Sequence, residues 1–154
     1  GLGFRVTGWS QSGRPVPGIE ALTGPDLPQA LARAEILICL LPDTAGTRDL
    51  LNAQRLALLP QGATIINAGR GTLIDDPALL AALDRGLGHA VLDVFRHEPL
   101  PPDHPFWRHP RVTVTPHISA ETRPRTAAIV AAENLRGAMR GDPLLYLVDR
   151  KRSY

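Results

Sequence analysis

The feature that most constrains the fold is an alternation of short apolar runs with segments of helical period. The apolar runs are rich in Val, Ile and Leu and are followed by turn residues, as is typical of strands buried on both faces. Strands joined by helices form βαβ units, so the pattern predicts an α/β fold with a parallel sheet covered on both faces. The strands are expected at residues 4–9, 35–41, 63–67, 89–94 and 112–115.

Helices are expected between these strands and after the last of them. The segments with helical period are 27–33, a short 47–51, 53–58, 77–85 and roughly 121–140. One face of the last segment carries Ile129, Ala132, Leu135 and Met139. Gly141 and Pro143 are expected to end this helix. The segment 142–154 is expected either to fray or to pack on something beyond this chain.

Composition excludes several classes of protein. The chain has 154 residues and a net charge of +2, with basic residues scattered among acidic ones, which argues against a nucleic-acid partner. Its longest apolar run is too short for a membrane span, and no basic segment followed by an apolar one stands at its start, so neither a membrane span nor a signal peptide is expected in it. A single cysteine, Cys39, allows no internal disulfide or zinc cluster and fits a reducing, cytoplasmic setting; no metal site is expected. The only methionine is Met139, so we expect the chain to be N-terminally incomplete.

Three glycine pairs partly match the G-x-G-x-x-G pattern that cradles a dinucleotide pyrophosphate. The pairs at 1–3 and 86–88 are interpreted as loop glycines, because neither lies between a strand and the start of a helix. The third pair, Gly69 and Gly71, follows a strand and precedes a helix whose cap is Asp75 or Asp76. Between them Arg70 is placed where open α/β sheets bind ligands, and its planar fork suits a carboxylate. The alternative is a solvated loop arginine.

Two further polar residues follow the next two strands. Glu98 comes after the strand at 89–94, and His117 comes directly after the strand at 112–115. A histidine paired with a carboxylate can donate and accept a proton near neutral pH. Arg70, Glu98 and His117 are therefore predicted to share one edge of the sheet, although His117 could bond only backbone and Glu98 could be a surface acid. The other histidines are interpreted as structural: His89, His97, His104 and His109.

Five segments together resemble the D-isomer-specific 2-hydroxyacid dehydrogenases, and especially the branch that reduces glyoxylate and hydroxypyruvate. They are residues 8–12 (GWSQS), 41–47 (LPDTAGT), 66–71 (INAGRG), 92–101 (LDVFRHEPLP) and 115–120 (TPHISA). The resemblance implies an incomplete Rossmann-like, doubly wound parallel sheet that lacks its first strand and glycine-rich loop. It implies a partial dinucleotide-binding domain at 1–120. Residues 121–154 would be a connecting helix and tail that pack on an absent substrate domain.

The same resemblance implies an activity and the residues that perform it. The reaction would be NAD(P)H-dependent reduction of a small 2-oxo acid such as glyoxylate or hydroxypyruvate, by a homodimer when complete. Arg70 would bind the substrate's carboxylate and carbonyl oxygen, Glu98 would pair with His117, and His117 would protonate the carbonyl oxygen. Two alternatives stay open: a non-catalytic, dinucleotide-sensing protein like a corepressor, and an inactive truncated product.

The resemblance also assigns a cofactor site. Asp93 would contact the nicotinamide carboxamide, and the remaining cofactor contacts would come from Leu41, Pro42, Thr47, Ala68, Gly69 and Ser119.

Cofactor choice is expected to depend on the loop after the strand at 4–9. Ser10 stands where NAD enzymes place an acid against the ribose, so Ser10, Ser12 and Arg14 could hold a 2′-phosphate, which favours NADP over NAD. Gln11 stands where the resembled branch carries an arginine, which weakens that preference.

Overall fold

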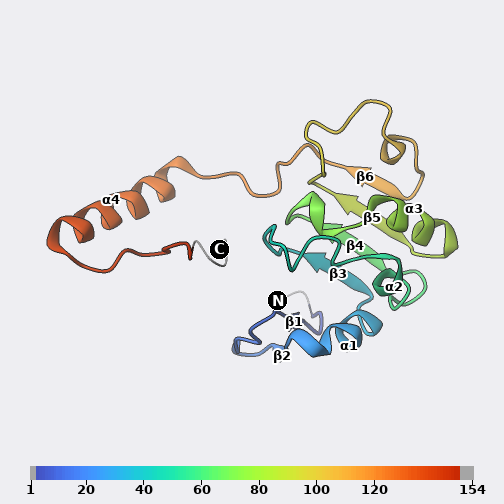
Figure 1. Cartoon of the computed structure of the whole chain (residues 1–154), viewed down its shortest axis with the longest axis horizontal. Coiled ribbons are helices and arrows are strands. Elements are labelled where there is room, and N and C mark those ends of the chain that lie inside the picture. The colour runs from blue at the N-terminus through green and yellow to red at the C-terminus, as the bar shows by residue number, and fades with distance from the viewer. Residues whose placement is uncertain (1–2, 150–154) are drawn as a thin grey trace.

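The computed structural model describes residues 3–149, in which parallel strands and short helices form an α/β body and a long helix projects from it (Figure 1). The strands are β1 (Thr7–Trp9), β2 (Glu20–Leu22), β3 (Ile36–Cys39), β4 (Thr64–Asn67), β5 (His89–Leu92) and β6 (Val112–Val114). The α-helices are α1 (Leu27–Ala32), α2 (Ala53–Leu56), α3 (Asp76–Arg85) and α4 (Pro124–Arg140). Three short 3-10 helices are η1 (Gly24–Asp26), η2 (Gly71–Leu73) and η3 (Pro105–Trp107).

The strands form two parallel sheets whose order is that of a doubly wound fold. β1 pairs with β2, and the second sheet has the order β3-β4-β5-β6. In a Rossmann sheet the strands lie in the order 3-2-1-4-5-6. With the first strand lacking, as the resemblance implies, β1 corresponds to the second strand of that order, β2 to the third and β3 to the fourth. No strand within residues 3–149 occupies position 1, next to both β1 and β3. The α/β, Rossmann-like class predicted from the sequence is confirmed.

The hydrophobic core lies on one face of the four-stranded sheet. Ile65 of β4 and Ala90 of β5 are fully buried there against Leu79 and Leu83 of α3. Leu56 of α2 belongs to the same cluster. These contacts fix the strands relative to one another and therefore fix where the loops after them emerge.

On the opposite face of the sheet, strand β3 is open to solvent in the described part of the chain, whereas Ile66 of β4 and Val91 of β5 are partly buried. Ile36 and Ile38 of β3 are 48% and 57% exposed, and Leu40 just beyond it is 70% exposed. The prediction of a sheet covered on both faces is therefore wrong for residues 3–149. The connection from β1 to β2 contains Pro15 and Pro17 and forms a loop, not a helix.

Most predicted elements overlap an observed element. The predicted and observed ends of these elements differ by at most three residues. Two elements differ from the prediction. The strand β2 was not expected, because its sequence, EAL, has neither β-branched residues nor an apolar run. The helix predicted at 47–51 is a series of turns, in which Thr47 Oγ1 accepts from the amide of Thr44 (2.9 Å) and donates to Pro42 O (2.6 Å). A threonine hydroxyl that bonds nearby backbone competes with helix formation.

The glycine interpretations agree with the structure where it is described. Gly86 ends α3 with φ 131°, and Gly3 has φ 82° with open space around it, as loop glycines do. Gly1 and Leu2 lie outside the described residues.

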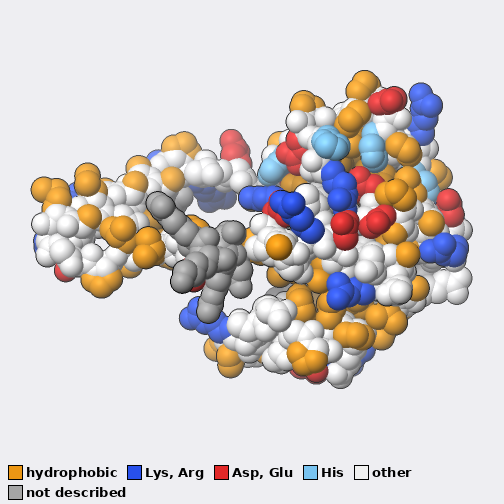
Figure 2. Space-filling view, in the orientation of Figure 1, with side chains coloured by type: hydrophobic (Ala, Val, Ile, Leu, Met, Phe, Trp, Pro, Cys, Tyr) orange, Lys and Arg blue, Asp and Glu red, His pale blue; other side chains and the backbone are white. Residues whose placement is uncertain are grey.

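Helix α4 extends away from the body, with its apolar side chains on the surface (Figures 1 and 2). Ile129, Leu135 and Met139 are 59%, 65% and 81% exposed. The helix ends at Gly141, as predicted, with φ 77°. The segment that follows turns back along α4, where the amide of Leu145 donates to Oδ1 of Asn134 (2.7 Å). Residues 150–154 of the predicted tail lie outside the described part.

Candidate active site

The loops that follow β4, β5 and β6 emerge at one edge of the sheet. The three strands are parallel and in register, with Asn67 beside Leu92 and Leu92 beside Val114. Because the carboxyl ends of parallel strands meet at the same edge, residues just beyond these ends become neighbours. Arg70, Glu98 and His117 follow β4, β5 and β6 in that order.

The turn that carries Arg70 is built by a buried asparagine. Asn67 is 1% exposed; its Oδ1 accepts from the amide of Gly69 (3.2 Å), and its Nδ2 donates to Arg70 O (3.0 Å). The side chain of Arg70 is exposed and donates to Gly69 O (2.7 Å). Sequence reasoning missed Asn67, although a polar residue at the inward position two after Ile65 was a usable signal. Helix α3 beyond this turn is capped by Asp75, one of the two predicted caps.

Gly71 lets the loop after β5 reach Arg70. A Cβ atom at Gly71 would lie 1.9 Å from the carbonyl carbon of Phe95. The backbone of Phe95 and Arg96 therefore lies directly on Gly71, where no side chain fits. This contact places the segment leading to Glu98 beside the turn that carries Arg70.

Glu98 and His117 form a hydrogen-bonded pair. Oε2 of Glu98 lies 2.8 Å from Nδ1 of His117, and Oε1 accepts from the amide of Phe95 (2.9 Å). Both side chains remain partly exposed, at 36% and 48%. Burial raises the pKa of Glu98, but bonds from His117 and Phe95 and the charges of His117 and Arg70 hold it below its usual value. The structure thus brings together the three residues predicted to share this edge.

Asp93 holds the loop that carries His117. Its carboxylate is 3% exposed and accepts four hydrogen bonds. Oδ1 accepts from Oγ1 of Thr115 (2.5 Å) and the amide of Ile118 (3.0 Å), while Oδ2 accepts from the amide (2.9 Å) and Oγ (2.6 Å) of Ser119. Burial raises the pKa of Asp93, but these four bonds outweigh it and hold the pKa well below its usual value. The predicted contact of Asp93 and Ser119 with a cofactor stays a prediction.

The serine loop after β1 is an ordered turn. The amide of Ser10 donates to Leu22 O (3.2 Å), and its Oγ accepts from the amide of Gly13 (3.0 Å). Gln11 lies over Gly24, where a Cβ atom would be 3.0 Å from Nε2 of Gln11. Two further predicted residues of the loop are exposed: Ser12 and Arg14.

The other predicted cofactor residues belong to the loops after β3 and β4. The Thr47 hydroxyl bonds to Pro42 O, as described above, and fixes the loop after β3. The amide of Ala68 donates to Cys39 O (3.1 Å), and a Cβ atom at Gly69 would lie 2.9 Å from Leu41 O. The two loops therefore pack backbone against backbone, which only a glycine at position 69 permits.

Three of the remaining histidines have structural partners. The imidazole of His89 bonds Oγ1 of Thr113 (2.8 Å), and His109 lies 3.4 Å from Asp84. The ring of His104 packs at a tilt of 58° against that of Phe106, with 4.4 Å between the ring centroids. Between residues 3 and 149, no group of three or more His, Cys, Asp or Glu side chains is arranged to hold a metal ion.

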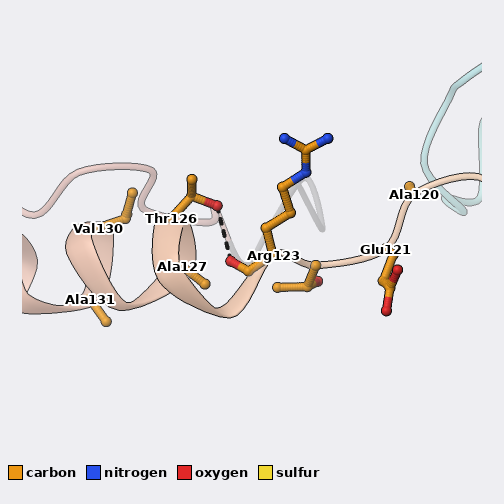
Figure 3. A pocket seen from close by; sticks show the side chains of 8 residues that line it. Ala120, Glu121, Arg123, Thr126, Ala127, Val130 and Ala131 are labelled. Carbon is orange, nitrogen blue, oxygen red and sulfur yellow. Dashed lines mark hydrogen bonds between the residues drawn. The ribbon is translucent and has the colours of Figure 1, made fainter.

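A wide concavity at the start of α4 is lined by residues between Ala120 and Ala131, with the hydroxyl of Thr126 donating to Arg123 O (3.0 Å; Figure 3). None of the predicted site residues lines it.

None of the described helices has the length and apolar character needed to cross a bilayer.

Comparison with known proteins gives consistent matches over nearly the whole chain. A family model described as "D-isomer specific 2-hydroxyacid dehydrogenase, NAD binding domain" matches residues 1–119. A glyoxylate/hydroxypyruvate reductase A from Salmonella newport (strain SL254) is 44% identical over 99% of this chain and 49% of its own length. The chain therefore spans about half the length of the curated relatives that it matches.

Two solved structures share the fold closely. A D-isomer specific 2-hydroxyacid dehydrogenase from Xanthobacter autotrophicus Py2, in complex with NADPH and MES, is 46% identical with a TM-score of 0.94, covering 99% of this chain and 64% of that one. An NADPH-dependent glyoxylate/hydroxypyruvate reductase from Sinorhizobium meliloti, in complex with NADP and sulfate, is 39% identical with a TM-score of 0.93, covering 99% and 50%.

Proposed function

Because this chain belongs to the D-isomer specific 2-hydroxyacid dehydrogenase family, we propose that it forms part of an NADPH-dependent reductase of small 2-oxo acids, glyoxylate or hydroxypyruvate. The observation that carries the proposal is the pairing of His117 with Glu98 at 2.8 Å, with Arg70 near enough to lower the pKa of Glu98. A cation for the substrate carboxylate and a proton donor then meet at one edge of the sheet.

The proposed mechanism assigns one task to each side chain. The nicotinamide, when bound, supplies a hydride to C2 of the 2-oxo acid. The guanidinium of Arg70 binds the substrate carboxylate and stabilises the negative charge that grows on the carbonyl oxygen. Glu98 occupies Nδ1 of His117 and orients the ring, so Nε2 delivers the proton to that oxygen.

The residues after β1 fit the phosphate end of NADPH. The Oγ of Ser10 already accepts an amide hydrogen from Gly13, so its own hydroxyl hydrogen can be donated to a 2′-phosphate. Ser12 and Arg14 are exposed on the same loop. A serine at position 10 also avoids the repulsion that an acid would impose on that phosphate. Gln11 supplies no charge, so we expect a moderate preference for NADPH over NADH.

We also propose that residues 1–120 belong to the nucleotide-binding domain and that residues 121–154 pack on a substrate domain. The support is the exposed apolar face of α4, which a monomeric protein rarely leaves uncovered. A homodimer and a cytoplasmic location, both expected from the sequence, stay predictions.

The test compares the 154-residue chain with the protein made from its complete reading frame. Each is assayed for NADPH oxidation with glyoxylate and with hydroxypyruvate, and we expect turnover from the longer protein and little or none from the 154-residue chain. In the longer protein, Arg70→Ala should raise KM and lower kcat, reducing kcat/KM roughly 100- to 1,000-fold. Arg85→Ala, which removes an exposed arginine of α3, is the matched control and should leave both constants unchanged.

Two results would contradict the proposal. Unchanged kcat and KM for Arg70→Ala would show that Arg70 takes no part in substrate binding or catalysis. No turnover of either acid by the longer protein would refute the proposed reaction, and brisk turnover by the 154-residue chain would refute the need for a further domain.

A further inference from the structure

We propose that Arg96 is a positioning residue: its guanidinium ties the segment 95–98 to the loops after β3 and β4, and this keeps Glu98 on His117. The inference rests on the proposed function, because it concerns the carboxylate that orients the proton donor. The bonds of Arg96 go to Asp49 and to Ile74 O, so it acts through the backbone that carries Glu98.

The first argument is that this segment is fixed at both ends of η2. The backbone nitrogen of Arg96 lies 2.4 Å from the position that a Cβ atom would take at Gly71, the first residue of η2. The side chain of Arg96 reaches the other end, where Nε donates to Ile74 O (3.1 Å) and Nη2 donates to the same oxygen. Because η2 directly follows Arg70, this double contact fixes the segment that carries Glu98 relative to the turn that carries Arg70.

The second argument is that Asp49, the acidic partner of the guanidinium, is itself bonded to η2. Nη2 of Arg96 donates to Oδ1 of Asp49. The amide of Asp49 donates to the carbonyl oxygen of Thr72, in the middle of η2 (2.9 Å). Asp49 has φ 50°, in the left-handed region that aspartate and asparagine enter more often than most residues. The loop after β3 therefore presents its carboxylate to Arg96 from a backbone that is fixed on the same short helix.

The third argument is the charge around the guanidinium. Nε of Arg96 lies 3.8 Å from Oδ1 of Asp76, the first residue of α3. Burial raises the pKa of Asp76, and the charge of Arg96 counteracts that effect. The guanidinium thus faces two carboxylates and a carbonyl oxygen, and its side chain is only 30% exposed. Arginine suits this position because its planar fork bonds several acceptors in fixed directions.

The anchored segment holds Glu98 directly. Oε1 of Glu98 accepts from the amide of Phe95, the residue before Arg96 (2.9 Å), and Oε2 lies 2.8 Å from Nδ1 of His117. The carboxylate is therefore bonded to its own segment on one side and to the imidazole on the other. It can orient His117 only while that segment keeps its place.

Arg70 depends on different contacts. Its turn is fixed by the buried side chain of Asn67, which bonds the amide of Gly69 and the carbonyl oxygen of Arg70. Loss of the Arg96 side chain should therefore disturb the proton donor more than the residue that binds the substrate carboxylate. The expected signature is a change in kcat with little change in KM.

Three variants separate this role from a general effect on the fold. Arg96→Ala removes all contacts of the guanidinium. Asp49→Asn is milder, because it removes one charged partner, leaves Ile74 O in place and suits the left-handed backbone of position 49. Arg33→Ala is the matched control: it also removes an arginine–carboxylate pair, in which Arg33 bonds both oxygens of Glu20 (3.0 and 2.7 Å), and no predicted site residue belongs to that pair.

The experiment uses the protein from the complete reading frame. The constants kcat and KM for glyoxylate are measured at saturating NADPH, together with the pH profile of kcat/KM. Two measurements without cofactor require no turnover: the NMR titration of the Glu98 carboxyl carbon and hydrogen exchange at the amide of Phe95. Circular dichroism and thermal unfolding verify that each variant is folded, as expected because partly exposed ion pairs contribute little to stability.

For Arg96→Ala we expect kcat to fall roughly 10- to 100-fold, the scale for a catalytic group displaced by about 1 Å. KM should stay within about threefold of the wild-type value. The pKa of Glu98 should rise towards its usual value as its bonds to His117 and Phe95 weaken, which moves the acid limb of the pH profile to higher pH. Exchange at Phe95 should accelerate. Asp49→Asn should change each quantity in the same direction by less, and Arg33→Ala should change none of them.

Two results would overturn the inference. Wild-type kcat, Glu98 titration and Phe95 exchange in a folded Arg96→Ala protein would show that Glu98 does not depend on Arg96. A rise in KM alone, with titration and exchange unchanged, would make Arg96 a substrate-binding residue. If Arg96→Ala does not fold, Asp49→Asn decides between the same results. If the wild-type protein reduces neither acid, the proposed function fails, but the titration and the exchange still decide the role of Arg96.

Discussion

Helices α3 and α4 both have an apolar face at helical spacing, but the two faces lie in opposite surroundings. Both have one apolar face, but Leu79 and Leu83 of α3 are fully buried, whereas Leu135 and Met139 of α4 are 65% and 81% exposed. An apolar face at helical spacing therefore predicts that a helix needs a partner, and it does not say whether the described chain contains that partner.

The α/β body and helix α4 also differ in what they contribute to the predicted site. The predicted catalytic residues come from tight loops around the sheet that α3 covers, where backbone packs on Gly71 and a buried asparagine fixes a turn. Helix α4 contributes none of them. We expect substitutions in the body to disturb both stability and site, and substitutions in α4 to matter only where something covers it.

The largest expected difference is between two leucine truncations. Leu79→Ala in α3 should lower the free energy of unfolding by about 2–5 kcal/mol, because it opens a cavity in the core. Leu135→Ala in α4 should change it by less than about 0.5 kcal/mol in the 154-residue chain. Denaturant unfolding followed by circular dichroism measures both. Equal losses of stability would show that the two leucines are covered to the same extent, and a larger loss for Leu135→Ala in the longer protein would show that a further part of that protein covers α4.

A second pair of variants adds one methyl group to a glycine in each part. Gly71→Ala should cost roughly 1–3 kcal/mol or more, because its Cβ would overlap the backbone of Phe95. Gly137→Ala in α4 meets only ordinary contact with Asp142 at 3.7 Å, and alanine favours a helix by about 0.5–1 kcal/mol, so it should stabilise. The same unfolding experiment measures whether each substitution lowers or raises the free energy of unfolding. Gly71→Ala should also move Glu98, so tolerance of this change would contradict the close backbone contact.

The next expected effect is a dependence of stability on pH in the body. Since the folded-state pKa of Asp93 is lowered, its contribution is fully present above the pKa of an unfolded aspartate, about 3.9, and is lost as pH falls towards the folded value. The free energy of unfolding should therefore decline on acidification below about pH 5 more steeply in wild type than in Asp93→Asn. Parallel curves for the two proteins would disprove the assignment.

The smallest expected effect concerns the segment that turns back along α4. Asn134→Ala removes two hydrogen bonds to the backbone of Leu145, both at the surface, and should cost about 1 kcal/mol or less. Its main result should be local, with faster hydrogen exchange at the amide of Leu145 and no change near Asp93. A loss as large as that of Leu79→Ala would show that this segment stabilises the whole chain.

The sequence predicted the parts of the fold that depend on continuous apolar runs. The strands from β3 to β6 and helix α3 were found because their buried side chains repeat at strand or helix spacing. β2 has no such pattern and forms only because β1 offers it a pairing edge. The open face of the sheet was also missed, since alternation along a strand does not reveal which elements cover it.

The candidate site was predictable in position but not in its supporting contacts. Arg70, Glu98 and His117 were found because each follows a strand, and parallel strands end at one edge. The tasks of Asn67, Gly71 and Asp93 depend on backbone groups from other loops, which no spacing along the chain encodes. Their roles became visible only once the distances between loops were known.

The position of β3 has a practical consequence. Within residues 3–149 only one of its edges is paired, and Ile36 and Ile38 flank the other on the open face. An unpaired strand edge beside exposed isoleucines is a template on which a strand of another molecule can assemble. Concentrated solutions of the 154-residue chain should accordingly form oligomers by edge-to-edge strand pairing. A charged residue in place of Ile38 should keep the chain monomeric.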